Sequence, residues 1–232
     1  MSGRTTKVGT LAAAAVVALA FSSVLVHASP RATDSDDHYK PAGTQITGTS
    51  HKTIFSVPPS GGLTVTCTNS SSGGKTPATG IGRFAISPLP SFNDGVGKPC
   101  TDNLNGKDTT TTSGPWTIGM IDKANDETSA EPNTDQLSVV VPKGGAVVKT
   151  SEGCTIVVAP SAPYTVTGSY SDSTGTFTVN LTGSFSSLPV KVSGGGLCPV
   201  TPPNSTCSGQ SPALCSSFAG TYVFSPKVSD AS

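Results

Sequence analysis

The sequence contains few charged residues, and it lacks the composition of a helical or nucleic-acid-binding protein. Charged side chains make up 12% of the 232 residues, with 14 Lys and Arg against 14 Asp and Glu, whereas about 25% is usual in soluble domains. Coiled coils and helical bundles need Ala, Glu, Lys and Leu in quantity. Nucleic-acid binders need a basic face that replaces phosphate counterions. The composition excludes both classes.

Histidine is also scarce, and the sequence carries no clear catalytic or metal-binding signature. Only His38 and His51 follow the first 28 residues, and no Gly-x-Ser-x-Gly elbow is present. No two Cys have the short spacing of a zinc knuckle. We therefore assign no catalytic, cofactor-binding or metal-binding residue, expect an exposed His51, and predict that the protein is not an enzyme.

The first 28 residues have the pattern of a secretory signal peptide. Arg4 and Lys7 precede the uncharged run Val8–Val26, and Val26-His27-Ala28 offers a cleavage site. An uncleaved membrane anchor is the alternative, but small polar residues interrupt the run and a cleavage site follows it. We predict removal of residues 1–28, an extracellular location, no membrane span in the mature chain, and a flexible leader over residues 29–42.

All the cysteines follow the signal peptide, and their even number predicts disulfide bonds. We expect sequential pairing, because short loops cost the least entropy to close. A bond between Cys67 and Cys154, of the kind that joins the sheets of immunoglobulin domains, is the alternative. The predicted pairs are Cys67–Cys100, Cys154–Cys198 and Cys207–Cys215.

From residue 43 onward the sequence alternates between apolar and polar positions and is interrupted by Gly, Pro, Asn and Asp. Leu63, Val65 and Cys67 fall on one face of a strand, with Thr residues on the other. Trp116, by the same alternation, shares with Ile118 and Met120 the face of a strand that is expected to face the core. About nine to eleven such strands predict an antiparallel, immunoglobulin-like β-sandwich forming one domain over residues 43–232, with long disulfide-tied loops.

Three long loops interrupt this pattern, at residues 87–114, 122–135 and 193–216. The acidic residues of Asp122–Asp135 could hold Ca²⁺, since carboxylate oxygens suit that ion. The segment from Thr101 to Thr112 also resembles a calcium loop, but it has Thr where an EF-hand needs an acid at both ends. We therefore expect that removing metal leaves the stability nearly unchanged.

The segments Lys75–Cys100 and Thr101–Ile118, together with Asn125-Asp126-Glu127 and Gly153-Cys154-Thr155-Ile156, resemble a group of secreted, uncharacterised actinobacterial proteins. The resemblance implies an exported β-sandwich. It implies no activity and assigns no functional role to any residue.

We predict a non-enzymatic extracellular or cell-surface binding module that uses its loops to contact a protein or a polysaccharide. A polysaccharide-active or polysaccharide-binding module using the loop Asp122–Asp135 is one alternative. A protease inhibitor that presents the loop Cys198–Cys215 rigidly is another. Glycosylation triplets occur at Asn69, Asn180 and Asn204, and their use depends on the host.

Overall fold

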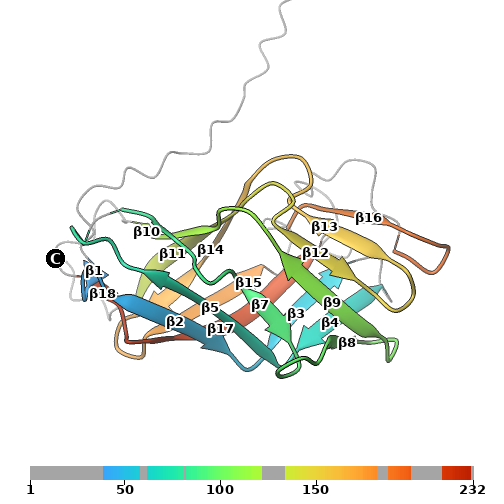
Figure 1. Cartoon of the computed structure of the whole chain (residues 1–232), viewed down its shortest axis with the longest axis horizontal. Helices are drawn as coiled ribbons and strands as arrows, with labels where there is room; N and C mark the ends of the chain where they lie inside the picture. Colours follow the sequence, from blue (N-terminus) through green and yellow to red (C-terminus); the bar gives the residue numbers. More distant parts are fainter. Residues whose placement is uncertain are drawn as a thin grey trace, which may run out of the picture. The chain divides into compact units, whose positions relative to one another are not determined.

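The computed structural model describes residues 39–57, 62–80, 82–121, 134–181, 188–199 and 216–230. All regular structure in these ranges is β-strand (Figure 1), as the sequence predicted. The strands are β1 (Tyr39–Lys40), β2 (Gln45–Ser50), β3 (Thr53–Val57), β4 (Leu63–Cys67), β5 (Asn69–Lys75), β6 (Phe84–Ala85), β7 (Ser91–Asn93), β8 (Cys100–Asp102), β9 (Lys107–Thr112), β10 (Thr117–Ile121), β11 (Thr134–Val141), β12 (Ala146–Lys149), β13 (Thr155–Val158), β14 (Tyr164–Ser171), β15 (Thr176–Leu181), β16 (Val190–Ser193), β17 (Ser217–Ser225) and β18 (Ser229–Asp230).

Sixteen of these strands form one antiparallel sheet, and β1 pairs separately with β18. The main path runs β16-β13-β12-β9-β8-β4-β3-β17-β15-β14-β11-β10-β6, and β2, β5 and β7 branch from it. This sheet is curled as a half-barrel, and a bridge between Gly74 and Ile86 links β5 to the chain just after β6. An immunoglobulin-like sandwich has two separate sheets, so the antiparallel all-β prediction is confirmed and the immunoglobulin-like arrangement is not.

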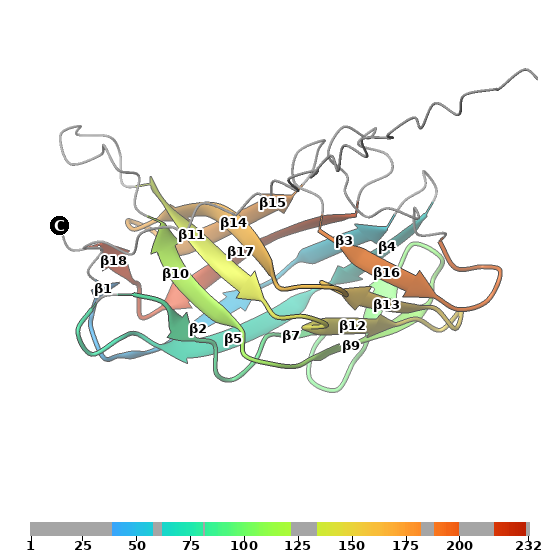
Figure 2. The ribbon, with the colours of Figure 1, turned by 90° about the horizontal axis from the view of Figure 1, so that it is seen from above.

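Strand β17 is a central strand of the curled sheet, and its neighbours on one edge change along its length. It pairs with β15 on one side, while β3 and then β2 pair with it on the other. Figures 1 and 2 show β10, β11 and β14 at one end of the sheet and β9, β12 and β13 at the other. The consecutive strands β2 and β3 therefore pair with different parts of β17, and the chain bends between them.

Buried hydroxyl groups satisfy the backbone where β2 turns into β3. Ser50 Oγ donates to the Lys52 carbonyl over 3.0 Å, and Thr53 Oγ1 lies 2.9 Å from Ser70 Oγ on the adjacent strand β5. Ser50, Thr53 and Ser70 are all buried. A bend buried without such partners would leave polar groups unpaired at a cost of about 1–3 kcal/mol each.

The hydrophobic core lies on the inner face of the curl, as the alternation predicts. Every second residue of β4 is buried. Trp116 is buried together with Ile118 and Met120, which confirms its assignment to the core. The Trp116 indole N–H donates to the carbonyls of Ser113 and Gly145 over 3.0 and 3.2 Å, so its polar edge is satisfied inside the core.

The last residues of the predicted flexible leader take part in the fold. Tyr39, placed in the flexible leader of residues 29–42, is only 3% exposed and makes an edge-to-face contact with Phe84 at 5.4 Å. Its hydroxyl accepts a hydrogen bond from the Met120 amide over 2.8 Å. The aromatic ring and this bond fix β1, so residues 39–42 belong to the folded domain. Residues 1–38, which include the predicted signal peptide, lie outside the described part.

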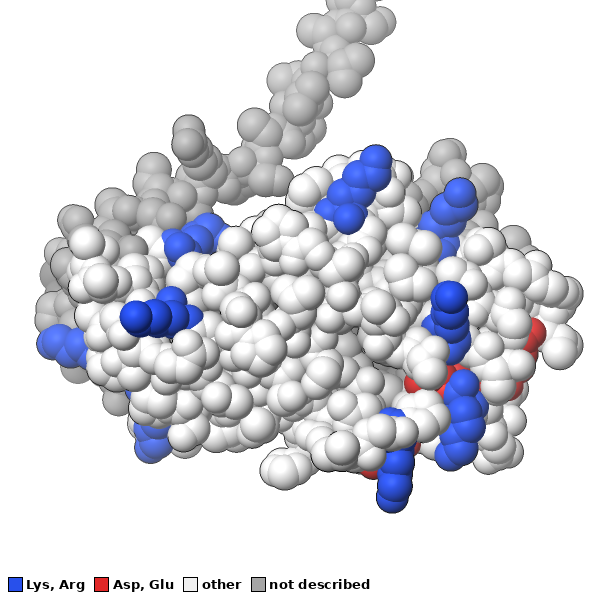
Figure 3. All heavy atoms as spheres, viewed as in Figure 1, with Lys and Arg blue, Asp and Glu red and all other residues white. Residues whose placement is uncertain are grey.

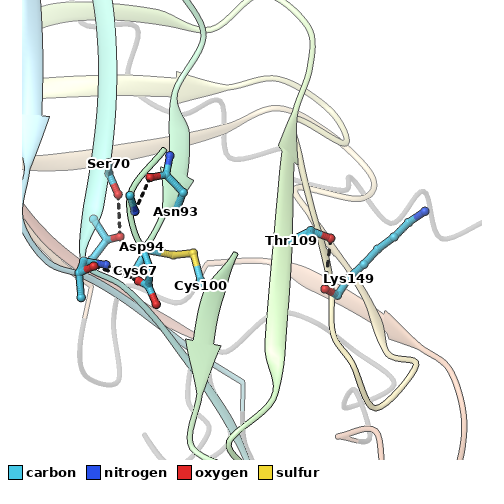
Figure 4. Close-up of a disulfide and its surroundings, with 10 residues drawn as sticks. Cys67, Ser70, Asn93, Asp94, Cys100, Thr109 and Lys149 are labelled. Atoms are coloured by element: carbon cyan, nitrogen blue, oxygen red, sulfur yellow. Dashed lines mark hydrogen bonds between the residues drawn. A yellow bond between two sulfur atoms is a disulfide. The ribbon is translucent and has the colours of Figure 1, made fainter. Parts of the chain in front are cut away.

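Two of the predicted disulfide bonds are present. Cys67 at the end of β4 joins Cys100 in β8 (Figure 4), and Cys154 joins Cys198, with Cα–Cα distances of 4.6 and 5.4 Å. These bonds exclude the alternative that pairs Cys67 with Cys154. Cys207 and Cys215 lie outside the described residues, so their bond stays a prediction. Within the described ranges, no helix has the length and apolarity needed to cross a bilayer.

Candidate metal centre

Three acidic side chains from separate parts of the chain meet at the end of the sheet that carries β8 and β9. Asp102 ends β8, Asp108 lies in β9, and Glu152 lies in the loop between β12 and β13. Strands β8 and β9 form a hairpin, and β12 pairs with the other edge of β9. The two turns are therefore neighbours, and one oxygen from each carboxylate lies within 4.8 Å of the others.

The turn from Asp102 to Gly106 is held by its own aspartate. Asp102 Oδ1 accepts hydrogen bonds from the amides of Leu104 and Gly106 over 2.8 and 2.7 Å, which is the common turn-forming role of Asp. Asn105 takes a positive φ of 65°, a conformation that Asn tolerates better than most residues. The turn thus fixes one Asp102 oxygen and leaves the other, Oδ2, to face the cluster.

The loop after β12 is tied to the same turn through Ser151. The Ser151 hydroxyl donates to Glu152 Oε1 over 2.8 Å and accepts from the Lys107 amide over 3.1 Å. Thr150 Oγ1 accepts from the Cys154 amide over 3.2 Å, which fixes the far side of the loop. Glu152 is thereby held against the hairpin of β8 and β9.

The carboxylates are withdrawn from water without being satisfied by the protein. Asp108 is 0% exposed and Asp102 8% exposed. Four oxygens, namely Asp102 Oδ2, both oxygens of Asp108 and Glu152 Oε2, are buried and have no hydrogen-bond partner. Buried polar groups are normally hydrogen-bonded, and buried charges are normally paired or bound to a metal. The cluster therefore lacks a positive partner of the kind that a cation supplies.

The electrostatics of the cluster follow from burial and from like charges. Burial, together with the negative charges of Asp102 and Glu152 and a hydrogen bond from the protonated carboxyl to Asp102, raises the pKa of the Asp108 carboxyl from 3.8 to about 7. The hydrogen bond from Ser151 lowers the pKa of Glu152. Glu152 therefore carries its charge at neutral pH, while Asp108 shares a desolvated site with two other acids.

The geometry fits an oxygen-coordinated divalent cation. Ca²⁺ binds oxygen ligands at about 2.3–2.6 Å, so ligands on opposite sides of the ion are about 5 Å apart. The separation of no more than 4.8 Å among the three donor atoms satisfies this condition. Ca²⁺ takes six to eight oxygens in flexible geometry and suits three carboxylates from one hairpin and a neighbouring loop better than Mg²⁺, which demands a near-ideal octahedron.

Gly106 keeps the space between the acidic side chains open. A Cβ atom placed on Gly106 would collide with Asp102 Oδ2, and it would lie 2.5 Å from both Glu152 Oε1 and Ser151 Oγ. No side chain larger than hydrogen therefore fits at this position while the acidic residues keep their places.

Both disulfide bonds brace this end of the molecule. Cys100 is the register partner of Asp108 in the β8–β9 hairpin, and Cys154 follows Glu152 by two residues. Asp94, shown beside the Cys67–Cys100 bond in Figure 4, accepts from the Thr68 amide over 2.7 Å. Figure 3 shows acidic side chains gathered at this end of the face, with Lys side chains around them.

The structure uses different residues from those that the calcium-loop resemblance suggested. Thr101 lies in β8, and the Thr112 hydroxyl donates to the Pro90 carbonyl over 2.7 Å, so neither end of that segment takes part in the cluster. His51 is exposed, as predicted. Residues 122–133 of the acidic loop and residues 200–215 of the third loop lie outside the described part. Sequence reasoning assigned none of the three acidic residues to a site. Asp102 and Asp108 lie inside the segment that resembles a calcium loop, and the only signal of Glu152 was the turn sequence Ser151-Glu152-Gly153.

Comparison of the chain with protein-family models, curated proteins and solved structures finds no significant match. The class of the protein is therefore argued from the fold and the carboxylate cluster.

Proposed function

We propose that the protein is an exported, non-enzymatic, calcium-binding β-domain that recognises an extracellular protein or polysaccharide through the loops around the ion. The observation that carries this proposal is the fully buried, unpartnered carboxylate of Asp108, which faces two further carboxylates. A bound Ca²⁺ would neutralise these charges and would supply the missing partners.

Cation binding suits the cluster better than acid–base catalysis. A catalytic acid must be within hydrogen-bond reach of its substrate. Asp108 is 0% exposed, so a polymer cannot reach it without displacing the surrounding chain, whereas an ion enters through a much smaller opening. Acid–base catalysis by Asp108 is therefore disfavoured.

The ion would order two of the three loops that the sequence marks for recognition. The turn Asp102–Gly106 lies within residues 87–114, where strands β7, β8 and β9 and the turns between them replace the single loop that the sequence predicted. Cys154 ties the Glu152 loop to Cys198, within the predicted loop of residues 193–216. In immunoglobulin-like domains, too, loops gathered at one end of the strands carry recognition. A calcium-ordered loop loses less entropy when a partner binds.

An extracellular location agrees with this role. The signal-peptide pattern, the disulfide bonds and the resemblance to secreted actinobacterial proteins all support export. Extracellular calcium modules bind with dissociation constants of about 0.1–1 mM, which is the range we expect here. Intact mass of the protein from culture medium tests export, with a chain beginning near Ser29 as the expected result and a chain retaining Met1 as the contrary one.

The binding experiment uses the full mature chain, stripped of metal with a chelator and titrated with CaCl₂ by calorimetry and by thermal unfolding. At a ten- to hundredfold excess over the dissociation constant, a specific ion stabilises the fold by about 1.4–2.7 kcal/mol. For a domain of this size, the melting temperature rises by about 3–10 °C. This proposal replaces the sequence-based expectation that removing metal leaves the stability nearly unchanged.

The variant Asp108→Asn keeps the shape of the side chain and removes its charge, and we expect it to lose the calcium response. Asp94→Asn is the matched control, because Asp94 lies outside the cluster and an amide oxygen can still accept the Thr68 hydrogen bonds. An equal response of the wild type and Asp108→Asn to calcium would refute the proposal.

A further inference from the structure

A second feature of the molecule is independent of the acidic cluster: an apolar cavity inside the curled sheet. Its volume is about 130 Å³, and its walls come from strands at both ends of the sheet. Protein interiors contain few voids larger than a water molecule. An engineered apolar cavity of about 150 Å³ stays dry and binds benzene, so a space of this size can hold a small molecule.

The walls of the cavity are largely aromatic and aliphatic. Trp116, Phe177 and Phe224 line it, and the rings of Phe177 and Phe224 stack at a centroid distance of 6.4 Å. Water needs two to four polar partners to occupy a buried site, and these walls offer almost none. An apolar occupant is therefore favoured over solvent.

A small group of hydroxyls interrupts the apolar wall on one side. Tyr222 and Thr53 line the cavity, and Ser70 hydrogen-bonds to the hydroxyl of Tyr222 and to Thr53 Oγ1. Burial raises the pKa of Tyr222, so its hydroxyl stays protonated. Because a hydroxyl offers one donor and two acceptor positions, Tyr222 keeps capacity for one further partner.

Two aromatic rings of the cavity wall are partly exposed to solvent. Phe92 in β7 and Phe218 in β17 line the cavity, are only partly buried, and contact each other edge-to-face at 6.2 Å. Strand β7 has three residues and, among the described strands, pairs with β5 alone. Rotation of partly exposed rings is fast, so this pair offers a route for a ligand to enter.

We propose that the cavity binds a compact, uncharged apolar molecule, of about the size of a single benzene ring with one substituent, that carries one hydroxyl group. The ring lies among Trp116, Phe177 and Phe224, and its hydroxyl bonds to Tyr222. Small pockets that combine apolar walls with a few convergent polar groups are the usual form of a specific ligand site.

The test uses two probes of equal size, phenol and toluene, titrated onto the full mature protein in calcium-containing buffer and followed by NMR chemical shifts. Both probes bind the wild type in the millimolar range or tighter. Tyr222→Phe weakens phenol about tenfold, the effect of one lost hydrogen bond, and leaves toluene unchanged. Tyr164→Phe is the matched control, because Tyr164 is half-buried and does not line the cavity.

A filling variant tests the location. Ala146 lines the cavity, and Ala146→Leu places extra carbon atoms there, so both probes lose their binding while the melting temperature holds or rises. Val166→Ile, which adds a single methyl group at another lining position, weakens both probes if Ala146→Leu does not fold. Failure of both probes to bind the wild type, or unchanged binding in the filled variants, would overturn the proposal. Neither result depends on whether calcium binds.

Discussion

In the absence of calcium, the substitution Asp108→Asn should change how stability depends on pH. Burial and the neighbouring acids raise the pKa of Asp108 from 3.8 to about 7, whereas in the unfolded chain the carboxyl keeps its ordinary pKa. Between these two values the native state binds a proton that the unfolded state has lost. The stability that the bound proton of Asp108 gives to the native state is therefore complete below about pH 4, and it is lost as the pH rises through 7.

Because Asp108 binds one proton, the change in stability with pH that it causes has an upper limit. Stability can fall by at most about 1.4 kcal/mol per pH unit between the two pKa values, which corresponds to about 3–6 °C per unit in melting temperature for a domain of this size. Asn does not titrate, so this component is absent in Asp108→Asn. The difference in melting temperature between the variant and the wild type should therefore grow in favour of the variant from pH 5 to pH 8.

The assay is thermal unfolding of the wild type, Asp108→Asn and the control Asp94→Asn at pH 5, 6, 7 and 8 in chelator. Taking the difference from the wild type removes the contribution of other titrating groups. Asp94→Asn should follow the wild type. Parallel profiles for the wild type and Asp108→Asn would show that Asp108 is not the desolvated, unpartnered group described above.

Three further variants test separate parts of the structure. Gly106→Ala should abolish the calcium response with all three acids intact, while Gly195→Ala, whose Cβ would meet nothing within 4 Å, should keep it; equal calorimetric titrations would contradict this. The double variant Cys154→Ser, Cys198→Ser should lose about 4 kcal/mol in urea denaturation and bind calcium more weakly, and unchanged affinity would count against the bracing role. Tyr170→Phe leaves both backbone groups of Val228 unpaired and should cost about 1–3 kcal/mol, whereas an unchanged unfolding midpoint would show that water replaces the hydroxyl.

Local pattern predicted much of the fold. Alternation with period two predicted which face is buried in strands such as β4, and the burial of Trp116 and of alternate residues in β4 confirms this. The order of the cysteines along the chain predicted two bonds correctly. The buried face of a strand depends on neighbouring residues, and the pairing of the cysteines depends on the entropy of loop closure. Both can be read directly from the sequence.

Features set by distant pairing could not be predicted in this way. Whether strands separate into two sheets or continue around one curl depends on bends such as the one between Ser50 and Thr53, and alternation does not record them. Tyr39 sits in a polar segment, and only its contacts with Phe84 and Met120 place it in the core.

The acidic cluster is the clearest case of distant pairing. Asp102 and Asp108 lie six residues apart in one segment, but Glu152 joins them only because Lys149 and Thr109 are register partners in the β9–β12 pair. That register is set by the pairing of the strands across the sheet, and the local sequence around Glu152 does not show it.

The central claim is that a calcium ion occupies the space between Asp102, Asp108 and Glu152. The most direct measurement is a crystal structure of the mature protein grown with calcium chloride, with anomalous scattering used to identify the ion. We predict one strong peak at about 2.3–2.6 Å from an oxygen of each of the three carboxylates. An empty cluster at saturating calcium, with the carboxylates hydrogen-bonded to one another or to water, would contradict the account.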